Sequence, residues 1–275
     1  MDKKYIQLYS LKDVIADDFA GVLRRVKEMG YDGVEFAAGF YGGYEAGELK
    51  KLLAEIGLEA LSSHIMTAAI PDHLEYAAEL GIKYLIDPMA PINTYDEAIE
   101  WAKKFNEVGK LCAEKGIRFG YHNHRHEFLQ GKDGYLLETL ILNTDPDLVC
   151  FELDAGWTAC AGADVVALIQ KYPGRFKLIH LKECNHVAGA EPMPDFSKIP
   201  RDENGNIQIP PELLEKLLAQ LKWNCPSGQG IIDWPAVRDA ALGQGAEAFI
   251  VEREYNYADD IFKCVEEDLA FLAAL

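Results

Sequence analysis

Histidines and a carboxylate gather in one short stretch of the sequence, residues 119–128. His122, His124 and His126 alternate with other residues there, and Glu127 follows directly. Neutral imidazole and carboxylate groups are common ligands of divalent metal ions, and the same groups transfer protons near neutral pH. The stretch therefore predicts a metal site, a proton-transfer site, or both.

Three further segments, residues 151–154, 178–182 and 250–254, also read as apolar strands that become polar at their C-terminal ends. Each carries two polar side chains separated by one residue. Because side chains alternate across a strand, residues two positions apart share a face. Four strands are thus expected to direct pairs of polar side chains into the same end of the barrel. A single buried histidine could be an ordinary core residue, but the same pattern on four strands indicates a functional site. The pairs are His122 and His124, Glu152 and Asp154, His180 and Lys182, and Glu252 and Glu254.

Strand-like and helix-like segments alternate along the whole chain, and glycine follows several of the expected helices. Such alternation with short connections implies parallel strands, and a chain of 275 residues suits one α/β barrel. We therefore predict a single (β/α)8 TIM barrel over residues 1–275, whose chemistry lies at the C-terminal ends of the strands. A doubly wound open sheet is the alternative, but no GxGxxG or P-loop follows the first strand. Strands are expected at or near residues 5–9, 33–36, 58–64, 82–87, 117–123, 148–154, 176–182 and 248–252.

One connection is much longer than the others. Residues 183–232, between the seventh and eighth strands, contain six prolines, several glycines and one helix-like stretch at 212–221. Long insertions at the catalytic face tend to be lids or partner-binding loops, although a surface excursion without a role is the simpler alternative.

Composition restricts the classes of partner. The formal net charge is −18 and no dense basic patch occurs, which argues against nucleic-acid or membrane binding. Six cysteines without a CxxC pair are typical of reduced core residues. The first expected strand begins at Tyr5, which leaves no room for a signal peptide, so we expect a cytoplasmic protein that acts on a small molecule.

Several carboxylates in one cavity repel each other unless a cation or a proton compensates them. A divalent metal ion would do this. Mixed carboxylate and imidazole ligands favour manganese, with zinc, cobalt, iron and magnesium as alternatives.

These motifs resemble the sugar phosphate isomerase/epimerase family, the xylose-isomerase-like TIM barrels. The resemblance extends over nearly the full length and rests on six motifs. They are Gln-Leu-Tyr-Ser at 7–10, Gly-Val-Glu-Phe at 33–36, Tyr-His-Asn-His at 121–124, Leu-Asp-Ala-Gly-Trp at 153–157, Ile-His-Leu-Lys at 179–182 and Val-Glu at 251–252.

The resemblance implies a divalent metal ion held by a Glu, an Asp, a His and a second Glu. Asp154, His180 and Glu252 match the last three. Many relatives carry glutamate on the fifth strand where this chain has His122; we expect Glu127 to be the remaining ligand because of its charge, with His122 as the alternative.

The resemblance also implies roles beside the metal. Proton transfer or oxyanion stabilisation falls to His122, His124, Lys182 and Glu252. Substrate binding falls to Glu35, His64 and Trp157.

The predicted function is a metal-dependent isomerase or epimerase that removes a proton next to the carbonyl group of a keto-sugar. Elimination of the aglycone from a 3-keto-glycoside is the close alternative, because it shares this first step and needs only one base. A sugar-binding or scaffold barrel is the non-enzymatic alternative, and apurinic endonuclease activity is disfavoured by the negative charge. The sequence is compatible with a homo-oligomer and with a complex that contains a partner subunit.

Overall fold

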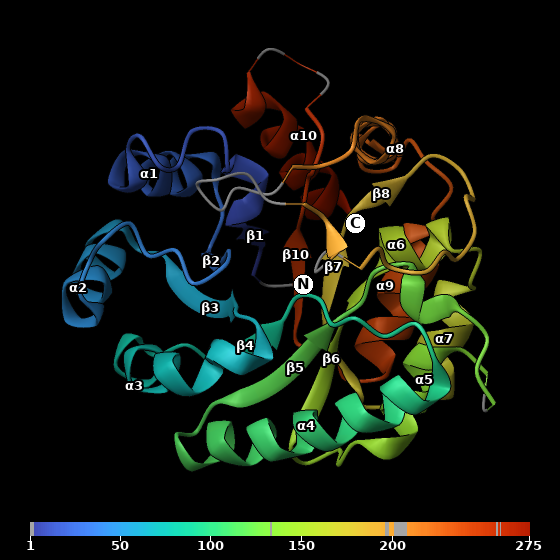
Figure 1. Cartoon of the computed structure of the whole chain (residues 1–275). Helices are drawn as coiled ribbons and strands as arrows, with labels where there is room; N and C mark the ends of the chain where they lie inside the picture. Colours follow the sequence, from blue (N-terminus) through green and yellow to red (C-terminus); the bar gives the residue numbers. More distant parts are fainter. Residues whose placement is uncertain (1–2, 133, 196–197, 201–207, 257, 259) are drawn as a thin grey trace.

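Eight parallel strands close into a barrel in the order β1-β10-β7-β6-β5-β4-β3-β2 (Figure 1). This computed structural model describes residues 3–132, 134–195, 198–200, 208–256, 258 and 260–275. The predicted (β/α)8 barrel is confirmed. Its strands are β1 Tyr5–Gln7, β2 Gly33–Phe36, β3 Glu59–His64, β4 Tyr84–Asp87, β5 Arg118–His122, β6 Val149–Asp154, β7 Phe176–Leu181 and β10 Ala248–Val251.

Helices surround the barrel, and local sequence signals set their limits. The side chain of Asp18 accepts a hydrogen bond from the Gly21 amide at the start of α1, and Gly30 ends that helix with a φ of 110°, which favours glycine. The helices are α1 Phe19–Met29, α2 Ala46–Ile56, α3 Ile70–Leu80, α4 Tyr95–Glu114, α5 Leu136–Asn143, α6 Ala155–Cys160, α7 Val165–Lys171, α8 Pro211–Leu221, α9 Trp234–Gly243 and α10 Ile261–Ala274.

The barrel interior contains a small apolar layer on the N-terminal side of the polar residues. This layer includes Cys150, Leu178 and Ile250. Two positions after each of them, on the same face of the chain, comes a polar residue of the site. A larger apolar core fills the space between the strands and the surrounding helices. The interior is thus apolar below and polar at the mouth, which places the acids and histidines above a packed floor.

The long connection between β7 and α9 carries elements of its own. Its first residues, β8 Glu183–Cys184, pair antiparallel with β9 Asn224–Cys225. The predicted helix at 212–221 is confirmed as α8, Pro211–Leu221. Residues 196–197 and 201–207 of the predicted insertion lie outside the described residues, and the role of this segment as a lid or partner loop stays a prediction.

Two loops at the barrel mouth hold the first part of this connection. Asn93 and Met193 exchange two hydrogen bonds, of 2.7 and 3.1 Å. Arg125 forms an ion pair with Glu191 and donates a hydrogen bond of 2.9 Å to the carbonyl of Gly189. The connection therefore crosses over the mouth instead of running along the outside.

None of the helices described is both long and apolar enough to cross a membrane.

Candidate functional site

The polar cluster lies inside the C-terminal mouth of the barrel, directly above the apolar layer. Its side chains come from β2, β3, β5, β6 and β7 and from the residues that follow β7 and β10, and all of them are buried. The members are Glu35, His64, His122, Glu152, Asp154, His180, Lys182 and Glu252.

His180 is at the centre of this cluster. Its Nε2 atom lies 2.8 Å from Oε1 of Glu35 and 3.0 Å from Oε1 of Glu152. Its Nδ1 atom lies 3.2 Å from Oε2 of Glu252. One imidazole therefore contacts carboxylates from three separate parts of the barrel, and this fixes the orientation of its ring.

Four residues offer a metal site. One ligand atom from each of His122, Asp154, His180 and Glu252 can be chosen so that all lie within 4.8 Å of one another. Oδ2 of Asp154 is buried and has no hydrogen-bond partner among the described residues. Two imidazoles and two carboxylates suit a divalent transition metal. A second group shares His122 and His180 and consists of His64, His122, Glu152 and His180.

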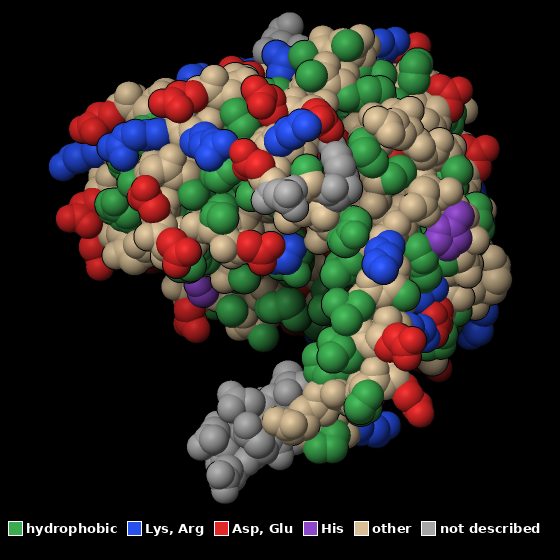
Figure 2. Space-filling model, turned by 90° about the horizontal axis from the view of Figure 1, so that it is seen from above, with side chains coloured by type: hydrophobic (Ala, Val, Ile, Leu, Met, Phe, Trp, Pro, Cys, Tyr) green, Lys and Arg blue, Asp and Glu red, His purple; other side chains and the backbone are tan. Residues whose placement is uncertain are grey.

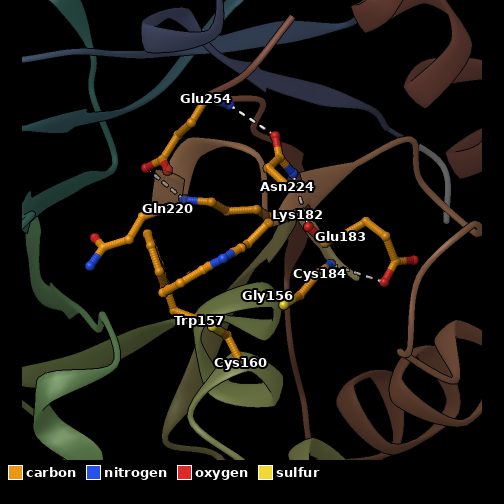
Figure 3. Close-up of a pocket in the computed structure, with 10 residues that line it drawn as sticks. Gly156, Trp157, Cys160, Lys182, Glu183, Cys184, Gln220, Asn224 and Glu254 are labelled. Carbon is orange, nitrogen blue, oxygen red and sulfur yellow. Dashed lines mark hydrogen bonds and ion pairs between the residues drawn. The ribbon is translucent and has the colours of Figure 1, made fainter. Parts of the chain in front are cut away.

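Lys182 brings an ammonium group to the acids of the metal group. Its Nζ atom lies 3.4 Å from Oδ2 of Asp154 and 3.2 Å from Oε2 of Glu252. It also lies 2.7 Å from Oε1 of Glu254 and 4.6 Å from the centre of the Trp157 ring. Figure 3 shows the lysine extended toward the Glu254 carboxylate with Trp157 beside it. Lys182 thus connects the cluster with the mouth.

Neighbouring acids hold two imidazoles and the lysine in their charged forms. Although burial lowers the pKa of His64, the carboxylates of Glu35 and Glu152 raise it to about 10. Burial likewise opposes the charge of His180, but Glu152 and Glu252 raise its pKa well above the usual range. Burial also opposes the charge of Lys182, but Asp154, Glu252 and Glu254 raise its pKa. These cations compensate part of the negative charge of the acids.

His122 and His124 behave in the opposite way. Burial, as the largest cause, holds the pKa of both imidazoles well below the usual range. Both rings are therefore neutral at pH 7 and offer a lone pair to a metal ion or a proton. Nδ1 of His124 is inaccessible to solvent and has no hydrogen-bond partner among the described residues.

The two acids of the metal group differ from each other. Burial raises the pKa of Asp154 to about 7. Burial also opposes ionisation of Glu252, but Lys182 and His180 hold its pKa well below the usual range. Asp154 also caps α6, because its Oδ1 atom accepts a hydrogen bond of 2.8 Å from the Trp157 amide.

Glu127, the expected first ligand, does not join this metal group. Its carboxylate is buried and accepts hydrogen bonds from the Tyr121 hydroxyl and, at 3.0 Å, from the His124 amide. His126 Nε2 lies 3.2 Å from it. His122 occupies the corresponding place in the metal group. The reason is local: β5 ends at His122, and Glu127 lies in a 3-10 turn, where strand alternation no longer decides direction.

Of the three expected substrate-binding residues, two lie within the buried cluster and one lies at the barrel mouth. Glu35 and His64 lie within the cluster: Oε1 of Glu35 lies 3.0 Å from His64 Nε2 and accepts a hydrogen bond of 2.8 Å from Gln7. Trp157 instead lies at the mouth, with its ring centre 5.7 Å from that of His124. Of these three residues, only Trp157 borders the open space above the cluster.

Glu152 is a functional candidate that the sequence analysis did not assign. Its Oε1 atom lies 2.7 Å from His64 Nε2, 3.0 Å from His122 Nδ1 and 3.0 Å from His180 Nε2. Its Oε2 atom is buried without a hydrogen-bond partner among the described residues. Its shared parity with Asp154 was visible in the sequence, but parity alone does not reveal that three imidazoles converge on it.

A cavity of about 360 Å³ opens above the cluster. Its wall on the cluster side includes His124, Trp157 and Glu254, whereas α8 and residues 191–194 form much of the opposite wall. Seen from above, hydrophobic side chains run along a projecting segment beside a hollow in the surface (Figure 2). The cluster is thus covered by a cavity large enough for a small organic ligand.

A protein-family model described as xylose isomerase-like TIM barrel matches residues 23–275 of the chain. Among solved structures, a sugar phosphate isomerase/epimerase from Parabacteroides distasonis superposes with a TM-score of 0.75 at 26% identity, covering 100% of this chain and 94% of that one.

Curated relatives carry the name inosose dehydratase. The protein from Clostridium tetani is 36% identical over 93 residues, which are 34% of this chain and 30% of that relative. The protein from Geobacillus thermodenitrificans is 26% identical over 239 residues, covering 76% and 74% of the two chains. The three matches first in rank span only 30–42% of the relatives' own length.

Proposed function

Because this chain belongs to the xylose isomerase-like TIM barrel family, we propose that it is a metal-dependent enzyme that isomerises or epimerises a keto-sugar or a related keto-polyol. The reaction begins with removal of a proton next to the carbonyl group. The observation that carries this proposal is the convergence of His122, Asp154, His180 and Glu252 on one point at the barrel mouth.

The donor set fits a divalent metal ion. We assign His122, Asp154, His180 and Glu252 as its ligands, with His122 in the place expected for Glu127. The buried Oδ2 atom of Asp154 supports this assignment, because it has no hydrogen-bond partner among the described residues and only the ion-pair contact of 3.4 Å with Lys182, and a metal ion would complete its interactions. Manganese is our first choice, and zinc, cobalt, iron and magnesium are the alternatives. When bound, the ion would act as a Lewis acid toward a substrate carbonyl.

We assign proton removal to His124. Its imidazole is held neutral by burial and borders both the cluster and the cavity. Its ring centre lies 5.2 Å from that of His122, so a ligand that reaches the metal group would pass beside it. A neutral imidazole at this position has a lone pair that can accept the proton.

Lys182 is the complementary group. Its ammonium is kept charged by Asp154, Glu252 and Glu254, and its Nζ atom is positioned to donate to a substrate oxygen near these acids. Return of a proton to the opposite face of the same carbon, which epimerisation requires, would fall to the protonated Lys182, which lies 3.2 Å from Glu252. Glu35 and Glu152 would orient His180 and His122, as outer carboxylates do for metal-binding histidines.

Elimination is the second candidate, because relatives of this chain are named dehydratases. It begins with the same proton removal and then expels a group from the neighbouring carbon. It needs one base only, so the histidine at position 122 would not impair it.

Hydrogen exchange tests the shared first step. The metal-reloaded protein would be incubated in deuterated water with a panel of keto-sugars, 3-keto-glycosides and keto-inositols, and each recovered compound would be analysed by mass spectrometry. Deuterium in an otherwise unchanged or epimerised sugar supports the isomerase, and loss of water or of an aglycone supports elimination. No exchange into any compound contradicts the proposal.

A matched pair of variants connects this activity with the metal group. Asp154 and Asp164 both cap a helix with their side chains, α6 and α7 respectively, but only Asp154 belongs to the metal group. Asp154→Ala should lose both the metal, measured by elemental mass spectrometry, and the exchange. Asp164→Ala should lose neither. A wild-type protein that takes up no metal would favour the sugar-binding or scaffold barrel.

A further inference from the structure

The cavity above the cluster has an apolar wall that the proposed chemistry does not use. Leu213, Leu217 and Leu221 of α8 face it, and Pro192, Met193 and Pro194 extend the same wall. Proton transfer and metal binding need none of these side chains. Their presence at the entrance to the cluster therefore requires a separate explanation.

Helix α8 carries a spacing of apolar residues that normally faces a protein core. Leu213, Leu217 and Leu221 recur every four residues, which places them on one stripe of the helix. All residues of α8 are described, and none of them is buried. An amphipathic helix gains most of its stability from covering such a stripe. Here the stripe faces the cavity, so an apolar ligand is the occupant that would cover it.

The Arg, Lys and Glu side chains in the wall already form ion pairs. Arg125 and Lys216 both form ion pairs with Glu191, and Glu254 pairs with Lys182. Placing a phosphate or carboxylate in the cavity would compete with these pairs. A neutral substituent would leave them intact.

The wall on the cluster side connects the cavity to the reacting centre. The His124 ring lies next to that of His122, and Trp157 and Glu254 both contact Lys182. A sugar held at the metal group would thus extend any large substituent upward, between Trp157 and α8. Neither the metal group nor Glu35, Glu152 or His64 borders this space, so cavity and cluster are two adjoining subsites.

We propose that this cavity is a subsite for a neutral aryl or alkyl group attached to the sugar, so that the substrate is a glycoside-like compound and not a free or phosphorylated sugar. The inference rests on the proposed function for the placement of the sugar ring. It adds the class of the substituent, and its volume of about 360 Å³ is within the range of small-ligand pockets.

Binding of two unreactive glucosides to the metal-loaded protein tests this subsite. Phenyl β-D-glucopyranoside and methyl β-D-glucopyranoside lack the keto group, so calorimetry reports binding without turnover. We expect the phenyl compound to bind at least tenfold more tightly, as burial of an aromatic ring predicts. Equal affinities, or no binding of either compound, would overturn the proposal.

Two leucines of the same helix give a matched control. Leu217 lines the cavity, whereas Leu214 lies outside its lining and is exposed. Leu217→Ser should reduce the phenyl preference about five- to tenfold and leave binding of the methyl compound unchanged, and Leu214→Ser should change neither. Leu217→Trp, which keeps the apolar character but fills space, should also weaken the phenyl compound selectively. An unchanged preference in both Leu217 variants would contradict the assignment.

The hydrogen-exchange experiment separates this inference from the proposed function. A phenyl preference without exchange into any keto-sugar would retain the subsite and reject the proton-transfer function. Exchange without a phenyl preference would retain the function and reject the subsite.

Discussion

Nε2 of His180, on β7, lies 2.8 Å from Oε1 of Glu35, on β2, although the two strands are not neighbours in the barrel. The side chains meet because both point inward at the same height. Glu35 also accepts hydrogen bonds from Gln7 and Ser62, which hold its carboxylate in place. The histidine ring is therefore oriented from across the barrel interior.

Replacing this carboxylate should weaken metal binding. Glu35→Gln keeps the volume but removes the charge opposite His180, so the ring loses its fixed orientation. Loss of such an outer partner typically costs 10- to 100-fold in metal affinity. Calorimetric titration of the demetallated variant with Mn²⁺ would measure this. Glu59→Gln, at the opposite end of the barrel, is the control; equal affinities in wild type and Glu35→Gln would contradict the assigned role.

His122 and Glu127 should differ in their effect on metal content. His122→Ala removes a member of the metal group and should leave the purified protein with little metal. Glu127→Ala should retain the metal but lower the free energy of unfolding by about 1–3 kcal/mol, because the buried Tyr121 hydroxyl loses its acceptor. Elemental mass spectrometry and urea unfolding of both variants would decide. Metal loss in Glu127→Ala alone would reverse our assignment.

Asp87 should make the protein less stable as the pH rises through about 6. Burial raises the pKa of this carboxyl to about 6 from a usual value near 4, so the folded state prefers its protonated form. Its contribution to stability is therefore complete below about pH 4 and is lost above about pH 6, a change on the order of 3 kcal/mol.

An Asp87→Asn variant, which cannot titrate, would isolate this contribution. The free energy of unfolding of wild type minus that of the variant should decrease between pH 4 and pH 7. Asp164→Asn, at an exposed helix cap, is the control variant. A difference for Asp87→Asn that stays constant with pH would contradict the prediction.

Glu183 should hold the long connection against the barrel. Its Oε2 atom accepts hydrogen bonds of 2.7 Å from the Trp234 indole and 2.9 Å from the Gly228 amide. Glu183→Ala would leave these donors without an acceptor, at about 1–3 kcal/mol for the buried Trp234 indole. We expect faster amide hydrogen exchange at residues 224–234 in this variant, and no change in Glu212→Ala, whose side chain is exposed.

The fold and most of the candidate site could be predicted from two patterns: the alternation of strand-like and helix-like segments, and the alternation of side chains along each strand. The order of strand-like and helix-like segments identified the barrel, and strand parity placed His122, Asp154 and His180 on one interior face. Parity works for these residues because each lies within a strand, where backbone geometry fixes the direction of the side chain.

Prediction was weaker where the chain leaves the strands. Glu127 follows β5 by several residues and turns toward Tyr121, a direction set by tertiary contacts. The path of residues 191–194 over the mouth depends on Asn93 and Arg125, which are distant in sequence. Such long-range pairings have no local signal, so the cavity beneath α8 was not predicted.

The lack of buried residues in α8 has an evolutionary consequence. The barrel core does not depend on the inner leucines of this helix, so exchanges among them cost little folding free energy. The acids and histidines below are held by a separate network within the barrel. Descendants of this chain could thus acquire new substituent preferences through α8 alone, while the inherited chemistry stays constant.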